Sequence, residues 1–515
     1  MSLKRWWSRA EALAGKPSGA TLAVEPSEWL SVATDAAAAG GQLVALWTTL
    51  YPGAAPAAAV RAALLVEGGL MVVELPLTGP APTYRGLQDV FPAAARMQRA
   101  AADLTGVRAD APDQRPWLRH GGWTAAEAPL AAVPSTPSAA APPVDDYAFV
   151  RVEGDGVHEV PVGPVHAGII EPGHFRFSIV GEKVLRLEER LGYVHKGIER
   201  RFTELPILEG HRLAARVSGD SAVAYSWAYC QALEGLARAA VPPRALWLRA
   251  LCLELERIQN HLGDLGALGN DAGFAFGLAQ FSRLKEELTR TMATTLGQRY
   301  LLDAIVPGGI AVDLPDEAAR ELALRLGRTA SLVRELRTIY DDHAGVRDRF
   351  AGAGTVAPEL ARRLGLTGLA GRASGLGFDL RVDAPGPPYH VMTPKLCMRR
   401  DGDVAARVNV RFDEIEESCR IARALVSELP AGALRLPLLE VPTGPRPAVG
   451  VIEGWRGPVL VALESREPGR IHRCHPHDPS WQNWPVIEHA VIGNIVPDFP
   501  LINKSFNLSY SGHDL

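Results

Sequence analysis

One stretch of the chain, from Gly163 to Glu234, carries many side chains that can bind or exchange protons. It contains imidazoles, carboxylates and a guanidinium group, at His166, Glu171, His174, His195, Glu199, Arg216 and Asp220. When such groups are buried together, burial and their mutual charges shift their pKa values. The elements around this stretch must therefore decide which of these groups meet.

The beginning of the stretch predicts a β-hairpin. A Gly163-Pro164 turn precedes alternating residues over 175–180, and Gly181-Glu182 supplies the next turn. From Leu187 onward the apolar spacing becomes helical, so we expect helices to follow.

Residues 1–123 have the pattern of a small α/β domain. Strand-like apolar runs cover 58–66 and 70–77, with a glycine-rich turn between them. Helical spacing follows over 93–104, and Gly106 is placed to end that helix. Residues 124–146 are rich in Ala, Pro and Ser and predict an extended linker.

Residues 147–515 predict a larger α+β domain that is mainly helical and has β-rich ends. Helical patterns cover 244–262, 281–296 and 317–336. Residues 401–428 predict a strand and then a helix whose charge run places Glu414, Glu416 and Glu417 on a solvated or partner-facing side. From Glu440 the sequence is a glycine-punctuated β region.

Composition excludes several classes of function. The net charge of −4 and the pI of about 6.4 do not indicate a nucleic-acid partner. No apolar run reaches the roughly 20 residues of a membrane helix, and the basic start lacks the apolar core of a signal peptide. We therefore expect a soluble cytoplasmic chain. No Walker or Rossmann fingerprint appears, so the residues do not support bound NAD.

The five cysteines and the histidines near the C-terminus are side chains of types that can bind metals. Cys230, Cys252, Cys397, Cys419 and Cys474 have no CxxC spacing, so we expect reduced core thiols instead of zinc, iron–sulfur or disulfide sites. The nearby histidines resemble a metal cluster on paper, but we do not expect zinc there; they are His472, His475 and His477.

The motifs GPxH, EPGHFRF, GYVHKGIE and RVxGxxxxxY follow one another from Gly163. This order resembles the large subunit of group 4 (energy-converting) nickel–iron hydrogenases and the 49-kDa-type subunit of respiratory complex I, up to Leu515. Residues 1–123 resemble the 30-kDa-type subunit of complex I. Its ERExxDLFGI…HPDLR signature matches 98–107 and 111–115, although both acidic residues of ERE are missing, and it implies a docking role.

The resemblance implies where nickel-binding thiolates would stand. The RVCGxC cysteines fall on Ser218 and Ser221, and those of PCxxCxxH fall on Asn507 and Tyr510. A soft metal site needs thiolates, which hydroxyl, amide and phenol groups do not replace. We therefore expect neither a nickel–iron centre nor hydrogenase activity.

Other site residues are also implied by the resemblance. Glu171 stands where these enzymes keep a proton-transferring acid, and Arg456 where an arginine lies above the metal. Glu199 and His513 match positions that hold Mg²⁺, with a plain hydrogen bond as the alternative.

The resemblance to complex I implies a quinone site formed by a loop with two histidines and by a tyrosine. The first histidine is present as His166, but the positions of the second histidine and of the tyrosine are occupied by Ile170 and Gly219. Asp220 is a new acid in the same place. Asp220 forms the candidate proton or redox pocket together with four other residues: Glu171, Arg216, Arg456 and His166.

These expectations favour the large subunit of a membrane-associated, complex I-like redox complex coupled to ion or proton translocation. An iron–sulfur small subunit of the 20-kDa type and antiporter-like membrane subunits would be its partners. The chain would lie on the inner face of the cell membrane, and any NADH oxidation would occur elsewhere in the complex. The alternatives are a quinone-reactive NADH-quinone oxidoreductase subunit and a catalytically silent scaffold.

Overall fold

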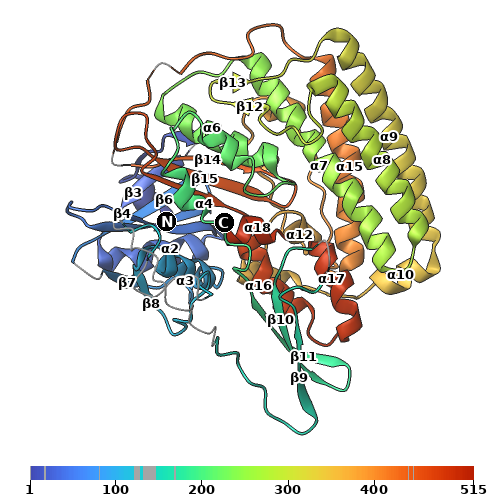
Figure 1. The fold of residues 1–515 in the computed structure, drawn as a ribbon, viewed down its shortest axis with the longest axis horizontal. Helices are drawn as coiled ribbons and strands as arrows, with labels where there is room; N and C mark the ends of the chain where they lie inside the picture. Colours follow the sequence, from blue (N-terminus) through green and yellow to red (C-terminus); the bar gives the residue numbers. More distant parts are fainter. Residues whose placement is uncertain are drawn as a thin grey trace, which may run out of the picture.

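The structure is a computed structural model that describes residues 2–16, 19–79, 82–120, 128–131, 147–167, 170–438, 440–444 and 446–515. It has the predicted α+β class: an N-terminal sheet, a central sheet and a layer of long helices lie side by side (Figure 1). Most of the predicted linker 124–146 lies outside the described residues. The predicted domain limits, 1–123 and 147–515, stay predictions.

The N-terminal sheet has five strands in the order β1-β3-β6-β5-β4. The strands are β1 Glu11–Ala12, β3 Gly19–Ala23, β4 Gln42–Leu50, β5 Ala58–Val66 and β6 Gly69–Leu77. Around it lie α1 Ser2–Trp7, α2 Pro26–Ala38, β7 Thr83–Arg85, α3 Ala94–Thr105 and β8 Arg108–Asp110. The predicted strand pair and helix are confirmed, and α3 ends at Gly106 with a left-handed φ of 76°.

The central sheet joins the two ends of the chain. Its strands are β16 Arg473–His477, β15 Pro458–Glu464, β14 Ala448–Glu453 and β2 Gly15–Lys16, in that order, with β2 parallel to β14. The buried side chain of Arg61 reaches Glu464 at 2.8 Å across the boundary between the two sheets. The β region predicted after Glu440 is therefore confirmed, and it packs directly on the N-terminal part.

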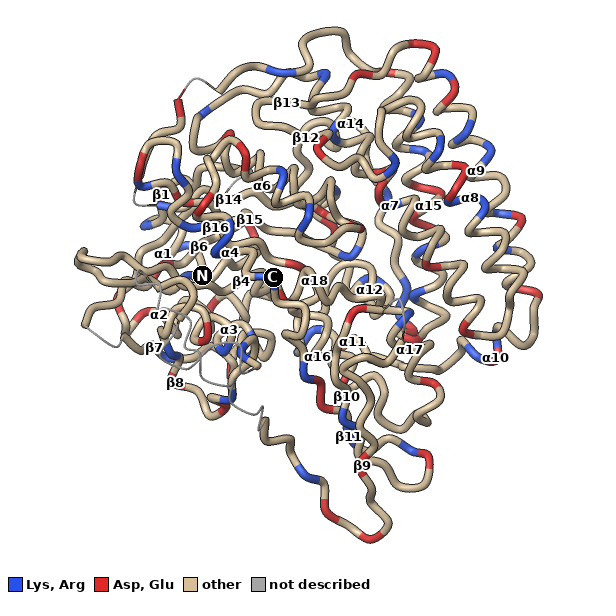
Figure 2. The backbone as a smooth tube through the Cα atoms, viewed as in Figure 1, with Lys and Arg blue, Asp and Glu red and all other residues tan. Residues whose placement is uncertain are grey.

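The long helices form one layer (Figure 1). They are α7 Pro243–Asp271, α8 Ala275–Leu296, α9 Asp316–Asp342 and α15 Val404–Ser427, whereas α6 Ala222–Leu236 packs on β14 and β15 of the central sheet. Basic and acidic segments alternate along the outer helices α8 and α9 (Figure 2). The shorter elements in this part are β12 Ile305–Val306, β13 Gly309–Ile310, α10 Ala344–Phe350, α11 Pro358–Leu364, α12 Gly368–Ala373, α13 Leu380–Asp383 and α14 Tyr389–Met392.

Two expectations for residues 401–428 are wrong. The strand expected there is absent, because Asp403 accepts a hydrogen bond from Ala406 N and begins α15 directly. Glu414 and Glu417 are buried, because α15 packs against both α7 and α9 and has no broad solvated side.

The predicted hairpin is confirmed as β10 His174–Val180 and β11 Lys183–Arg190, with β9 Val157–Val162 on its other side. The helix expected from Leu187 is wrong, since ladder hydrogen bonds to β10 keep the chain extended to Arg190. The remaining helices are α4 Ile198–Phe202, α5 Gly210–Ala214, α16 Ser480–Ala490, the 3₁₀ turn Val496–Asp498, α17 Phe499–Phe506 and α18 Tyr510–Asp514. No helix of the described residues is long and apolar enough to cross a membrane.

Candidate functional site

The loop between α5 and α6 carries the centre of the candidate site. Ser218 Oγ donates to Asp220 Oδ1 at 2.7 Å, and Ser221 Oγ lies 3.4 Å from the same oxygen. Ser221 is also the N-cap residue of α6, which places Asp220 beside the positive end of that helix. Both serines are buried, whereas the Asp220 side chain keeps 35% of its surface exposed. The loop therefore exposes part of the Asp220 carboxylate to solvent, while the two serine hydroxyls beside it are buried.

Arg456 comes from the turn between β14 and β15 and completes the site. Its two terminal nitrogens bond the two oxygens of Asp220, with Nη1 at 2.9 Å from Oδ1, and its Nε donates to the Asn507 carbonyl at 2.5 Å. The guanidinium stacks on Trp455 at 4.0 Å. Burial raises the pKa of the Asp220 carboxyl, but the charge and hydrogen bonds of Arg456 outweigh it and lower that pKa to about 2.

The C-terminal segment reaches this loop through Ser509. Ser509 Oγ lies 2.8 Å from Ser218 Oγ, whereas the Asn507 side chain donates to Asp264 at 2.7 Å. The Tyr510 ring packs on Trp484, 4.8 Å between centroids, away from the loop. Ser509, and not the expected Asn507 or Tyr510, is therefore the C-terminal residue whose side chain bonds Ser218.

Gly512 follows three residues after Ser509, in the first turn of α18. Its N–H donates to Ser509 Oγ at 2.8 Å. A Cβ added to Gly512 would lie 2.4 Å from Asp478 Oδ2, so the position has no room for a side chain. The Ser509 hydroxyl therefore links the backbone of Gly512 to Ser218 of the loop.

Three members of the expected proton pocket do not contact Asp220. Arg216 points outward and forms an exposed ion pair with Asp303 at 2.6 Å. Glu171 accepts from the backbone N of Ser511 at 3.0 Å and also bonds its hydroxyl. His166 bonds the Pro164 carbonyl and packs on Phe175. The cluster expected from the sequence therefore reduces to Asp220 and Arg456, because the other groups find nearer partners.

The expected magnesium pair is also separated by other partners. Glu199 pairs with Arg473 at 2.9 Å and His475 at 2.6 Å, and His513 pairs with Asp514 at 2.8 Å. Burial raises the pKa of Glu199, but Arg473 and His475 outweigh it and bring that pKa to about 2. Across the described ranges, no group of three or more His, Cys, Asp or Glu could hold a metal ion. A guanidinium thus neutralises the carboxylate that the magnesium hypothesis needed.

Helix α7 supplies two polar residues that hold the site loop and the start of α6. Asn260 donates to the Asp220 carbonyl at 2.8 Å and holds the loop. Glu256 accepts from Val223 N at 2.6 Å and Ala224 N at 3.3 Å, at the start of α6. Burial raises the pKa of Glu256 to about 8, against the lowering effect of these two donors. In the sequence, these residues could have been found as polar side chains that recur at helical spacing within ELERIQNH, residues 254–261.

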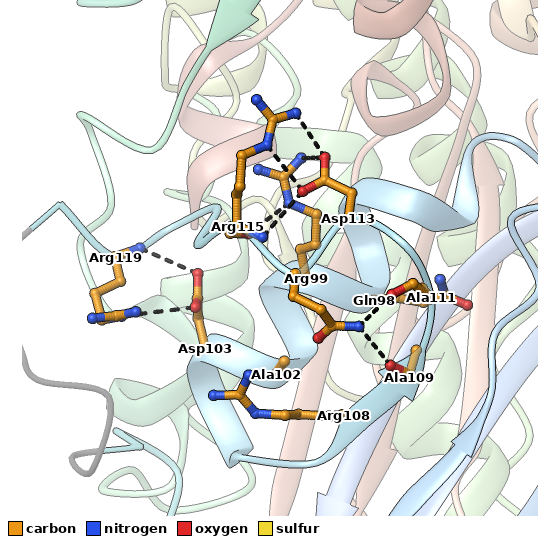
Figure 3. A pocket seen from close by; sticks show the side chains of 11 residues that line it. Gln98, Arg99, Ala102, Asp103, Arg108, Ala109, Ala111, Asp113, Arg115 and Arg119 are labelled. Carbon is orange, nitrogen blue, oxygen red and sulfur yellow. Dashed lines mark hydrogen bonds and ion pairs between the residues drawn. The ribbon is translucent and has the colours of Figure 1, made fainter. Parts of the chain in front are cut away.

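The N-terminal signature holds a backbone segment instead of a ligand. Asp103 Oδ2 accepts from the backbone N–H groups of Trp117 and Leu118 at 2.6 and 2.8 Å, and Arg99 donates to the Arg115 carbonyl at 2.7 Å. Figure 3 shows Arg99 beside Asp113 and Arg115, around a small cavity of about 70 Å³. The matched residues of the signature therefore have a structural role here.

Comparisons with known proteins agree with this architecture. Residues 271–442 match the family described as respiratory-chain NADH dehydrogenase, 49 Kd subunit. The chain is 30% identical to formate hydrogenlyase subunit 5 of Escherichia coli over 84% of this chain and 77% of that protein. It is 31% identical to NADH-quinone oxidoreductase subunit 4 of Thermus thermophilus over 67% of this chain and 91% of that protein. A chain of the membrane-bound sulfane sulfur reductase, an archaeal respiratory membrane complex, shares the fold with a TM-score of 0.66 at 23% identity, over 70% of this chain and 99% of that chain.

Proposed function

This chain belongs to the family of the 49-kDa subunit of respiratory-chain NADH dehydrogenase and the large subunits of energy-converting hydrogenases, and we propose that it is the large subunit of such a redox complex without a nickel–iron centre. Its homologues are subunits of complex I-like and hydrogenase complexes. The observation that carries the proposal is the ion pair between Asp220 and Arg456, beside the hydrogen-bonded Ser218 and Ser509.

The residues at this position do not fit a nickel–iron group. Ser218, Ser221, Ser509 and Gly512 offer hydroxyls and a backbone, with no sulfur among them. Soft transition metals are held by thiolates, which ionise at an accessible pKa. The carboxylate of Asp220 is already neutralised by Arg456, whose buried positive charge repels a cation. We therefore derive no step through a metal.

The chemistry that these residues can perform is electrostatic and proton-based. With a pKa of about 2, Asp220 stays ionised at neutral pH and holds Arg456 in place. Glu256, with a pKa of about 8, keeps a proton at neutral pH, and the negative charge of Asp220 helps to hold that proton. A negative charge that arrives near the loop would be stabilised by Arg456, and Glu256 is the acid that can donate a proton there.

The relatives support a set of partners. We assign the chain to a peripheral position on the inner membrane face, on an iron–sulfur small subunit and antiporter-like membrane subunits that translocate ions or protons. Support comes from the relatives, which belong to multisubunit respiratory membrane complexes.

Quinone reduction is the second candidate, and the relatives named as quinone oxidoreductases favour it. His166 is the one retained group, and it lies against Tyr510 with 6.3 Å between ring centroids. Ile170 and Gly219 lack the polar groups that this alternative needs. A catalytically silent scaffold is the third alternative.

Purification of the intact complex tests the proposal. We expect iron from a partner subunit, no stoichiometric nickel, and loss of redox-coupled activity in Asp220→Asn and Arg456→Gln. The matched control is Asp303→Asn, which breaks the exposed pair with Arg216. Stoichiometric nickel would overturn the proposal. Full activity of both site variants would favour the scaffold, and a quinone-dependent spectral change that survives in both would favour the second candidate.

A further inference from the structure

A buried cluster of charged side chains lies between α7, α12, α13, α15 and β14. It contains three guanidinium groups, four carboxyl groups and one imidazole: Arg257, Arg372, Arg381, Glu254, Asp379, Glu414, Glu453 and His261. Each of these side chains is at most 4% exposed. The proposed function uses none of them.

The members of the cluster are connected by hydrogen bonds and ion pairs, beginning with a line from Glu453 to His261. Arg372 bonds Glu453 at 2.9 Å and Glu414 at 2.7 Å, and the other oxygen of Glu414 lies 2.7 Å from His261 Nε2. Arg257 joins this line to the rest, because it lies 3.7 Å from Glu414 and 3.6 Å from Glu254.

The second half of the cluster is equally connected. Arg381 bonds Glu254 at 3.1 Å and Asp379 at 2.7 Å, and Arg372 lies 3.7 Å from Asp379. A change of charge at one member therefore changes the electrostatic energy of the others, since interactions between buried charges are weakly screened.

The cluster has one more carboxyl group than guanidinium groups, which favours binding of one additional proton. Three guanidinium groups give +3 and four ionised carboxylates give −4, so the cluster carries −1 when His261 is neutral. A net buried charge without a partner is costly. Among the neighbouring groups, Arg411 is already paired with Asp264 at 2.9 Å, and the neutral Tyr389 donates its hydroxyl to Glu254 at 2.7 Å. The buried Arg407, two turns before Glu414 on α15, bonds a hydroxyl and two carbonyls and contacts none of the cluster. The adjacent acid Glu256 would add a further negative charge if it ionised.

Hydrogen-bond donors identify the carboxyl that holds this proton. Glu254, Asp379 and Glu414 each accept at least three hydrogen bonds from side-chain or backbone donors. Glu453 accepts one from Arg372 and a long one, 3.3 Å, from Leu380 N. Burial and the charge of Asp379 raise the pKa of Glu453 to about 7, against the effect of Arg372.

The two ends of the line face different surroundings. Glu453 lies on the wall of a cavity of about 1050 Å³, which is bounded by β6, α6, α7 and β14. His261 lies at the other end, edge-on to Trp455 at 5.9 Å, and the Trp455 indole N–H donates to the Asp220 carbonyl at 2.9 Å. Among the described residues, His261 Nδ1 is buried without a hydrogen-bond partner.

We propose that this cluster stores one exchangeable proton, which rests on Glu453 at the cavity wall and whose release depends on the charge at the Asp220 site. The coupling to Asp220 rests on the proposed function, whereas the stored proton does not. Release breaks one O–H bond at Glu453 and forms one O–H bond on water in the cavity. Arg372 and Glu414 keep their charges, so the net charge of the cluster becomes more negative by one.

Two neutral substitutions in the full-length chain test the stored proton. Glu453→Gln should keep the melting temperature close to that of the wild type, because it replaces a neutral acid with a neutral amide. Glu414→Gln should lower it strongly, because it removes a carboxylate that Arg372 and His261 need. Infrared spectra recorded in a Glu256→Gln background, because Glu256 also keeps a proton at neutral pH, should show a protonated-carboxyl band that disappears as the pH rises through about 7. This band should be lost in Glu453→Gln.

The control for the infrared band is Glu464→Gln, which removes a buried carboxylate already bound by Arg61, Thr49 and Tyr51. The band should survive in this variant. If Glu453→Gln is as destabilising as Glu414→Gln and the band is unchanged, the stored proton is refuted.

Activity of the assembled complex separates the two proposals. Glu453→Gln should slow turnover at least several-fold. If Asp220→Asn leaves the activity unchanged, the proposed function fails but the infrared result on Glu453 stands. If the infrared result holds and Glu453→Gln keeps full activity in a complex that needs Asp220, the coupling to the Asp220 site is refuted.

Discussion

Ser218 Oγ and Ser509 Oγ lie 2.8 Å apart although 291 residues separate them in the chain. Both are buried, and Ser218 also donates to Asp220. The two hydroxyls therefore connect the loop before α6 with the last turn of the chain, where the resemblance to hydrogenases implied sulfur atoms around a metal.

Loss of the Asp220 carboxylate should destabilise the protein. In Asp220→Asn the buried Arg456 guanidinium loses its counter-charge, which costs several kcal/mol at a fully buried pair. Because 35% of the Asp220 side chain is exposed, we expect about 1–3 kcal/mol in urea unfolding. Asp303→Asn breaks an exposed pair and should cost less than about 1 kcal/mol. Equal losses in both variants would contradict the assignment.

The Glu256 carboxyl predicts a stability that falls with rising pH. Its pKa is about 8 in the folded protein against 4.5 as the ordinary value, so the unfolded chain releases the proton first. Its contribution is complete below pH 4.5 and is lost as the pH rises towards 8, by about 1.4 kcal/mol for each pKa unit. Glu256→Gln should flatten this part of the pH profile of unfolding free energy. A profile as steep as that of the wild type would refute the assignment.

Glu199 predicts the opposite pH dependence. Its pKa is about 2 in the folded protein, so it stabilises the fold above pH 4.5 and this contribution is lost as the pH falls towards 2. In Glu199→Gln the acid-induced loss should be smaller. Millimolar Mg²⁺ should leave the melting temperature of the wild type unchanged, because Arg473 occupies the carboxylate. A rise that depends on the Mg²⁺ concentration and disappears in Glu199→Gln would restore the magnesium hypothesis.

Asp103 should be important for stability because its carboxylate accepts hydrogen bonds from three backbone N–H groups. Asp103→Ala leaves the N–H groups of Trp117, Leu118 and Arg119 without their acceptor, and we expect a loss of about 2–4 kcal/mol, because each unsatisfied buried group costs about 1–3 kcal/mol. Asp89→Ala, at an exposed position with one weak contact to Gln88, is the control and should change the unfolding free energy by less than about 0.5 kcal/mol. A loss below 1 kcal/mol in Asp103→Ala would mean that water replaces the carboxylate.

Local patterns predicted the elements well where the physical signal is local. The strand pair β5 and β6, the helix α3 with Gly106 at its end, and the long helices α7, α8 and α9 follow from side-chain periodicity and glycine geometry. Predictions failed at Leu187 and before α15, where the period was ambiguous over a few residues. In those places ladder hydrogen bonds and a capping carboxylate decided the conformation.

The burial of Glu414 could not be predicted from the local sequence pattern. A run of acidic residues on a helix is typical of a solvated face, but α15 packs against both α7 and α9, and Arg372 and His261 meet Glu414 there. Only a compensating charge from a distant segment makes such a position tolerable, and that partner is not visible in the neighbouring sequence.

The sequence by itself determined the family, the order of the elements and the absence of cysteine from the motifs that would bind nickel, because these depend on residue type and local spacing. The tertiary structure alone decided that Ser509 faces Ser218, that Arg216 turns outward to Asp303, and that Asp220 pairs with Arg456. The reason is physical: a charged or polar side chain takes the best partner within reach, and packing between segments hundreds of residues apart determines which partners are within reach.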